Sequence, residues 1–187
     1  SFLKYSKQSP EVYRKLLAGL LLFTLFNSSD VFLLLKAKDA GLNDTQVIGI
    51  YIFYNLVYAL FAFPVGALAD KIGLKRMFIA GLALFSVVYA VFSFNTNLYV
   101  FVGLFFLYGL YASATEGVSK AWISNISDPK DTATAIGTFS ALQSLSTMAA
   151  SSVAGIIWFS LGAPTLFVAS AVVALGVAAY LWGIREE

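Results

Sequence analysis

The stretch GALADKIGLKRMF, Gly66 to Phe78, separates two long apolar segments with one short polar interruption. Gly73 permits the positive φ that a tight turn requires, and the basic pair Lys75 and Arg76 follows directly. An apolar helix crosses a hydrocarbon core in about 20 residues, so a short basic loop between two such segments indicates a turn at the headgroup level. The stretch therefore predicts two antiparallel membrane helices joined by a tight turn.

The same alternation of apolar segments and short polar separators continues along the whole chain. Of the 187 residues, 59% are hydrophobic and 12% are charged, which is unlike a soluble domain. The segments are long enough for transmembrane helices and too long for barrel strands. We expect an all-α integral membrane protein with a cytoplasmic lead-in at 1–12 and a six-helix bundle at 13–187. The six expected spans are 13–36, 45–69, 75–94, 98–126, 133–159 and 163–184.

The composition argues against several classes of function. The chain contains no Cys and no His, so we expect no disulfide, no thiolate chemistry and no metal site built from these residues. A net charge of +2 is too small for a nucleic-acid binder with a broad basic face. The chain also lacks G-x-S-x-G and places a single Asp at membrane depth. The sequence thus predicts neither an enzyme nor a cofactor.

Basic residues are divided unequally between the two sides of the expected bundle. If the N-terminus is cytoplasmic, nine Lys and Arg residues fall on that side and two on the other. Cytoplasmic loops carry an excess of Lys and Arg, so we expect both termini in the cytoplasm and the protein in a plasma (inner) membrane. The nine are Lys4, Lys7, Arg14, Lys15, Lys71, Lys75, Arg76, Lys130 and Arg185, and the two are Lys36 and Lys38.

A weak internal repeat relates the two halves of the chain. VGALADKIG, Val65 to Gly73, aligns with AGIIWFSLG, Ala154 to Gly162, with both glycines matching at an offset of 89. Chance matching of glycines in a Gly-rich chain is the alternative explanation. Because each repeat would hold three helices, the second copy enters the membrane from the opposite side, as in secondary transporters. We therefore expect two inverted three-helix repeats.

The opening stretch resembles the loop signature of the major facilitator superfamily, G-x-L-A-D-R-x-G-R-(K/R)-x. Lys71 stands in place of the usual Arg, and Leu74 replaces the first basic residue after the second glycine. The resemblance covers nearly the whole chain. The matching residues are Gly66, Leu68, Ala69, Asp70, Gly73, Lys75 and Arg76.

Members of that superfamily resemble two six-helix halves, and this chain looks like the C-terminal one. YGLYASATEG in the fourth span lacks the R-x-x-x-G pattern of N-terminal halves, and the fifth span lacks the G-P-x-x-G-G bend. The resemblance implies an N-terminal six-helix half as the partner. It also implies that Gly66, Asp70, Gly73, Lys75 and Arg76 form a conformational latch against that half, with Gly66 permitting a close helix approach.

Asp30 is the ionisable residue at membrane depth in the first span. A charge there costs at least about 2.5–3.5 kcal/mol, which calls for a partner, a wet cavity or a function. Thr24, Asn27 and Asp30 recur every three residues, as one polar stripe on a helix. The stripe predicts a water-filled path lined by Asn27 and Asp30. The alternative is that the Asp30 side chain extends toward Lys36 or the outer headgroups.

Glu116 and Lys120 lie four residues apart in the fourth span, with the acid first. This is the favoured order for an intrahelical ion pair, so a self-neutralising structural pair is one interpretation. The other is that Glu116 faces the cavity as the inverted counterpart of Asp30. Either carboxylate would carry a proton between the two sides, or pair with a cationic substrate or a Lys.

Further cavity candidates come from the middle helix of each triplet. Tyr51 and Asn55 lie at helical spacing in the second span, and Gln143 lies in the fifth. Thr147 and Ser151, which follow Gln143 at helical spacing, are more typical of helix packing.

The resemblance implies a secondary active transporter of a small solute that works by alternating access. The carboxylates at membrane depth add the expectation of proton coupling. The expected partners are a small-molecule substrate, H+ and the lipid bilayer. A passive channel or a membrane assembly module of six helices is the alternative, although no charged ring or carbonyl-filter pattern is present.

Overall fold

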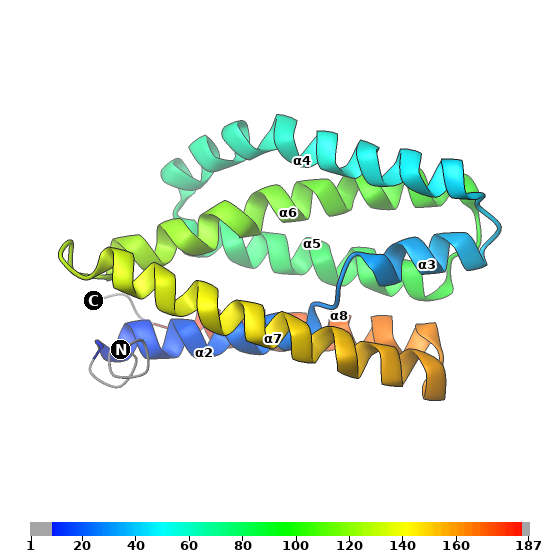
Figure 1. Cartoon of the computed structure of the whole chain (residues 1–187). Coiled ribbons are helices and arrows are strands. Elements are labelled where there is room, and N and C mark those ends of the chain that lie inside the picture. The colour runs from blue at the N-terminus through cyan, green and yellow to red at the C-terminus, as the bar shows by residue number, and fades with distance from the viewer. Residues whose placement is uncertain (1–8, 185–187) are drawn as a thin grey trace.

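The computed structural model describes residues 9–184, which form helices and no strand. Six stretches within this range are long and apolar enough to cross a membrane, as the sequence predicts. The first combines α2 and α3, and each of the other five is a single helix (Figure 1). The helices are α2 (Glu11–Phe26), α3 (Val31–Asp39), α4 (Asp44–Ile72), α5 (Leu74–Phe94), α6 (Leu98–Ile126), α7 (Thr132–Leu161) and α8 (Ala163–Trp182).

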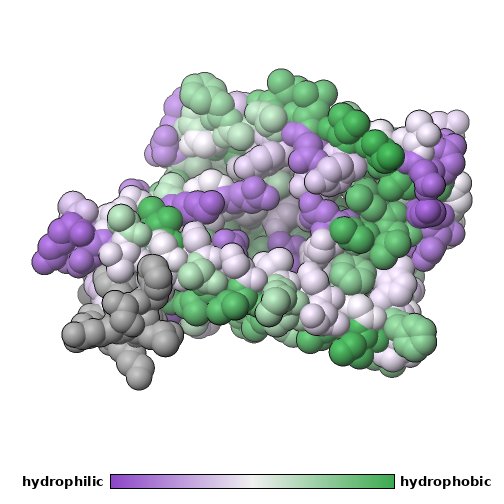
Figure 2. Space-filling view, viewed as in Figure 1, coloured by the Kyte–Doolittle hydropathy of each residue, from purple (hydrophilic) through white to green (hydrophobic). Residues whose placement is uncertain are grey.

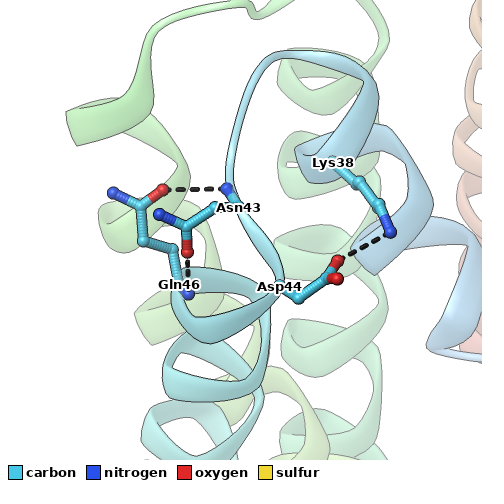
Figure 3. A network of polar contacts seen from close by, with 4 residues as sticks. All are labelled: Lys38, Asn43, Asp44 and Gln46. Carbon is cyan, nitrogen blue, oxygen red and sulfur yellow. Dashed lines mark hydrogen bonds and ion pairs between the residues drawn. The ribbon is translucent and has the colours of Figure 1, made fainter.

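Local side-chain contacts fix the start of α4. The Asn43 side chain accepts a hydrogen bond from Gln46 N–H, and the Gln46 side chain accepts one from Asn43 N–H (Figure 3). This reciprocal capping satisfies two backbone donors that have no partner within the helix. Beside the cap, Lys38 Nζ lies 2.6 Å from Asp44 Oδ1. The turn between α3 and α4 is therefore closed by both a cap and an exposed ion pair.

Five of the six predicted spans are confirmed, with ends that agree to within three residues. The prediction of one continuous helix over 13–36 is wrong, because α2 ends at Phe26 and α3 begins at Val31. Four consecutive polar residues, Asn27 to Asp30, fill the interval. Side chains of this kind compete with the helix for backbone hydrogen bonds. A length-and-hydropathy argument does not detect such a break, because the residues on both sides of it are mostly apolar.

The backbone changes direction at Asn27, which has φ −92° and ψ 86°. Asn27 N–H still bonds back to the carbonyls of Phe23 and Thr24, and helical bonding resumes where Phe32 N–H donates to Ser29 O. Backbone without helical hydrogen bonds is tolerated at membrane depth only where it is buried in protein or lines a water-filled space. The break therefore marks a position where something other than lipid contacts the chain.

The two triplets of helices pack in equivalent ways. α4 packs along α6, the first helix of the second triplet, and α7 packs along α2, the first helix of the first. The third helices, α5 and α8, pack against each other. Gly73 and Gly162 end the middle helices with φ of 99° and 84°. These are the glycines aligned in the sequence, so the packing agrees with the predicted three-helix repeat.

Close helix contacts occur at other glycines than the one predicted. A Cβ at Gly81 in α5 would lie 2.6 Å from a side-chain atom of Thr115, and one at Gly109 in α6 would lie 2.9 Å from Tyr54 O. Small residues at these positions let α6 lie directly against α5 and α4. A Cβ at Gly66 would meet no atom within 4 Å. Within residues 9–184 no other helix approaches Gly66 closely, so the close approach expected there stays a prediction about a partner outside them.

The helix ends segregate into two groups. Tyr13 OH donates to Ala135 O at 3.0 Å, which joins the starts of α2 and α7. The α4–α5 turn and the α6–α7 loop lie at the same end, and the α3–α4 and α5–α6 loops lie at the other (Figure 1). The predicted basic side therefore lies at one end of the bundle and Lys36 and Lys38 at the other. Lys4, Lys7 and Arg185 of the predicted set fall outside the described residues.

One face of the molecule is hollowed between two layers of helices. In the view of Figure 1, α4 and α6 lie above and α7 lies below. Hydrophilic residues gather in the hollow, and hydrophobic residues cover the upper and lower margins (Figure 2). This distribution separates a polar interior from the surfaces that suit acyl chains.

Candidate functional site

A cavity of about 340 Å³ lies beside the break between α2 and α3. Residues of α2, α5, α6, α7 and the break itself form its wall, so both triplets contribute. Four of the predicted cavity residues line it, namely Asn27, Asp30, Glu116 and Gln143. Its other polar residues are Thr24, Ser28, Ser29, Tyr108, Tyr111, Thr115, Ser119, Thr147 and Ser151.

The carboxylate of Asp30 is held by hydroxyl groups from two other helices. Tyr54 OH in α4 donates to Oδ2 at 2.8 Å, and Tyr108 OH in α6 donates to Oδ1 at 2.6 Å. Both tyrosines are buried. Hydrogen bonds to an ionised acceptor at such distances are among the strong ones in proteins. Asp30 is thus bonded within the bundle, and its side chain does not extend toward Lys36 or the outer headgroups.

Asn27 and Ser28 present hydrogen-bonding atoms that the described residues leave open. Asn27 Nδ2 donates to Tyr111 OH at 3.0 Å, whereas Asn27 Oδ1 is buried and has no hydrogen-bond partner. Ser28 is 5% exposed, and its Oγ has no hydrogen bond within 3.5 Å, although the Tyr89 hydroxyl is a close neighbour. Buried polar atoms are nearly always bonded to protein, water or ligand. Neither atom is exposed to the cavity, so a molecule in the cavity could bond them only if the wall at the break moves.

The polar stripe predicted for the first span is wrong as a helical face. Of its three members, Thr24 alone lies within α2, while Asn27 ends that helix and Asp30 precedes α3. All three still line the cavity, because the non-helical link passes along its wall.

Glu116 lines the cavity from α6 and has an exposed side chain. Tyr58 of α4 is a close neighbour. Lys120 is exposed as well but does not line the cavity. Among residues 9–184, no ion pair within 4.0 Å joins Glu116 to Lys120. Glu116 and Lys120 therefore do not form the intrahelical ion pair that their spacing of four residues favours.

The two middle helices contribute differently to the cavity. Asn55 Nδ2 donates to Tyr51 O one turn back in α4 at 2.8 Å, and neither residue lines the cavity. On α7, Gln143, Thr147 and Ser151 all line it. The two smaller side chains thus face the same space as the predicted amide.

A second cavity, of about 570 Å³, lies at the basic end of the bundle. Asp70 lines it from the last turn of α4, Gly73 from the α4–α5 turn, and Trp122 and Asn125 from α6. The side chain of Asp70 is exposed and forms no ion pair with another described residue. This cavity is larger but lies at the helix ends and holds a single charged residue, which suits a contact surface better than a solute site.

The two basic residues that follow Gly73, Lys75 and Arg76, differ in their contacts. Lys75 Nζ donates to Ile184 O at 2.5 Å, which ties the start of α5 to the end of α8. Cations near a helix C-terminus satisfy its free carbonyls and complement its dipole. Arg76 is exposed. Of the basic pair, Lys75 is therefore engaged within this bundle and Arg76 is open to a partner.

Sequence reasoning missed the tyrosines that bond Asp30. Tyr54 and Tyr58 lie one turn apart on α4, and Tyr108, Tyr111 and Thr115 follow at spacings of three and four on α6. Hydroxyls recurring on one side of an apolar helix need partners. That spacing was the available signal, and it points to the same cavity as the carboxylates.

Comparison with known proteins supplies the family. The sequence model of the Major Facilitator Superfamily matches residues 16–187. The chain belongs to this superfamily. It is 34% identical over 143 residues to an uncharacterized MFS-type transporter of Methanocaldococcus jannaschii, covering 73% of this chain and 36% of that protein. It is 30% identical over 112 residues to the MFS-type transporter ppzB of Metarhizium majus, covering 60% of this chain and 25% of that protein.

The major facilitator chain thus spans about a third or less of the length of these relatives. Its superfamily consists of transporters and not of enzymes, in agreement with the sequence. Together with six membrane-spanning candidates, the match makes it a multi-pass integral membrane protein. Within residues 9–184 no group of three or more His, Cys, Asp or Glu side chains could hold a metal ion.

Proposed function

We propose that this chain is the C-terminal six-helix half of a secondary active transporter, which moves a small solute by alternating access and couples it to protons. The observation that carries the proposal is the Asp30 carboxylate, which lies at a break in the first transmembrane helix and on a cavity wall. Discontinuous helices at the membrane midplane form the substrate and coupling-ion sites of many secondary transporters.

Asp30 and Glu116 are the proposed coupling carboxylates. Ionisable side chains that face a cavity in the membrane mark proton relays and substrate paths. Both line the 340 Å³ cavity, one from each triplet. Asn27 and Gln143 would contact the solute in this half. Lys120, Tyr51 and Asn55 remain predicted contacts of the larger site that the other half completes.

The hollowed face and the basic end are the proposed contacts with the N-terminal half. Asp70 and Arg76 are exposed and without ion pairs in residues 9–184, as expected of a latch whose partner is on another domain. Residues 1–12 would be the central loop that joins the halves. Both termini would then lie in the cytoplasm, with the protein in the plasma (inner) membrane.

The test is uptake by the complete transporter in proteoliposomes, measured against a solute panel with and without an imposed pH gradient. We expect saturable accumulation that depends on the gradient. Asp30→Asn and Glu116→Gln should abolish accumulation against a solute gradient, because each removes a group that carries the proton. Downhill exchange of the solute should survive in at least one of the two.

Asp128→Asn is the matched control, since Asp128 is an exposed carboxylate in the α6–α7 loop, outside the cavity. It should transport like the unmodified protein. Unchanged rate and coupling in both cavity variants would refute the assignment of the carboxylates. Flux that neither saturates nor responds to the gradient would favour a channel.

A further inference from the structure

The charged residues in the wall of the 340 Å³ cavity all have the same sign. Asp30 and Glu116 supply carboxylates, and no Lys or Arg is among its described lining residues. Lys120 lies one turn further along α6 and does not line it. We propose that this cavity binds an organic cation, an inference that rests on the proposed transport function and names the charge class of the solute.

Asp30 retains the capacity to bond a cation. An ionised carboxylate offers about four acceptor positions on its two oxygens. The hydroxyls of Tyr54 and Tyr108 occupy one position on each oxygen. These bonds hold the carboxylate in one orientation, which lowers the entropy lost when a ligand binds. The remaining positions are the strongest acceptors on the cavity wall.

Two buried polar atoms behind the wall add hydrogen-bonding capacity next to Asp30. Asn27 uses its amide donor on Tyr111, which leaves the buried acceptor Oδ1 without a partner. Ser28 Oγ, also buried, is next in the chain and lies beside the Tyr89 hydroxyl. Both atoms are covered in this structure, and if the wall moves on binding they would accept N–H groups of an ammonium, which donates and does not accept.

Aromatic rings make the cavity fit an organic cation better than a metal ion. Tyr108 and Tyr111 lie with ring centroids 5.2 Å apart, and Phe23 lies 6.3 Å from Tyr111. Rings attract a cation placed over their faces, and this attraction grows when water is excluded. Metal sites instead gather several hard ligands, which the described residues do not assemble here. The aromatic lining residues are Phe23, Phe78, Tyr108, Tyr111 and Phe139.

Other classes of solute fit the wall less well. An anion would meet two carboxylates with no compensating cation on the wall, and like charges in a medium of low dielectric constant repel strongly. A neutral solute would leave both carboxylates without a counter-charge when water is displaced. An organic cation compensates the charge and covers the apolar part of the wall.

The test compares two probes of similar size and shape with opposite charge, tetraphenylphosphonium and tetraphenylborate. Equilibrium binding to the purified complete transporter in detergent is measured with labelled probe and excess unlabelled competitor. We expect saturable binding of the phosphonium and none of the borate. Borate binding as tight as phosphonium binding, or no saturable phosphonium binding, would overturn the proposal.

Variants assign the preference to the cavity. Asp30→Asn keeps the size of the side chain and should weaken phosphonium binding about tenfold or more, since a factor of ten corresponds to 1.4 kcal/mol. Glu116→Gln should weaken it by less, and because Glu116 is exposed this variant stays informative if Asp30→Asn does not fold. Asp128→Asn should bind like the unmodified protein. If both cavity variants bound phosphonium as tightly as the unmodified protein, the assignment of the site to this cavity would be refuted.

The outcome separates this inference from the proposed function. Phosphonium selectivity without any proton-driven flux would support the cation site and contradict proton coupling. Proton-driven uptake of an anionic or neutral solute, without phosphonium binding, would contradict the cation site and support the transporter.

Discussion

The position of Asp30 depends on a small set of hydroxyl groups that come from distant parts of the chain. Tyr54 and Tyr108 bond its two oxygens from α4 and α6, and Asn27 bonds Tyr111 on α6. Three polar contacts thus connect the first helix of one triplet to its neighbours at the point where that helix is broken. These bonds satisfy polar groups at the break, where the helical hydrogen-bond ladder is interrupted.

Tyr108→Phe tests whether these bonds hold the break. The change keeps the ring but removes a donor at 2.6 Å from a carboxylate oxygen, so the free energy of unfolding should fall by about 1.5–3 kcal/mol. Thermal unfolding of the purified complete transporter measures it. Tyr99→Phe is the control, because Tyr99 is 88% exposed and donates no hydrogen bond from its hydroxyl to a described residue. Equal unfolding temperatures for the two variants would show that the bond adds nothing.

At the scale of helices, the turns after the middle helix of each triplet use the same device. Gly73 has φ 99° and ψ 136°, and Gly162 has φ 84° and ψ 160°. This part of backbone space is essentially restricted to Gly. Each turn lets the next helix begin at once, with Leu74 directly after the first glycine and Ala163 directly after the second.

Gly73→Ala and Gly162→Ala should each lower the free energy of unfolding by about 1–3 kcal/mol, because a Cβ strains this conformation. The two losses should be similar if the turns are equivalent parts of a repeat. Gly176→Ala in α8 is the matched control: its Cβ would meet nothing within 4 Å, and Ala is about 1 kcal/mol better than Gly inside a helix. Thermal unfolding of the three variants measures these changes in stability. A strong loss at one turn and none at the other would contradict their equivalence.

The difference between α4 and the first span shows which helices a sequence can predict. The ends of α4 are encoded locally, by the cap at Asn43 and by Gly73. The interruption at 27–30 contains neither Pro nor Gly, and its stabilising partners lie 24 and 78 residues from Asp30. The polar run at 27–30 weakens the helix locally, but the contacts that stabilise the break are tertiary and leave no periodic pattern, unlike a turn fixed by a glycine.

At the scale of the whole molecule, the same distinction applies to the cavity. Its carboxylates were predictable, because a charge in an apolar segment is costly and therefore conspicuous. The role of Tyr108 was indicated only by its spacing with Tyr111 and Thr115, which is a weak signal because a tyrosine is common on apolar and interfacial helices alike. The choice between Gln143 on α7 and Asn55 on α4 also required the packing of the triplets, because both are amides at helical spacing. The structure shows that α7 lines the cavity near Gln143, whereas α4 does not line it near Asn55.

The placement of most basic residues of residues 9–184 at one end of the bundle leads to a prediction about topology. The chain has no Cys, so single cysteines can be introduced after any Cys elsewhere in the complete transporter is replaced. Cysteines at Lys71 and Asp128 should react with an impermeant maleimide only after cells are permeabilised, whereas those at Asp39 and Thr96 should react in intact cells. All four positions are exposed at helix ends or in loops.

Val172→Cys, on the exposed apolar face of α8, is the control for burial in lipid. It should react poorly in both conditions because thiolates do not form in hydrocarbon. The reverse pattern would invert the orientation, and mixed labelling within either pair would contradict the six-span arrangement.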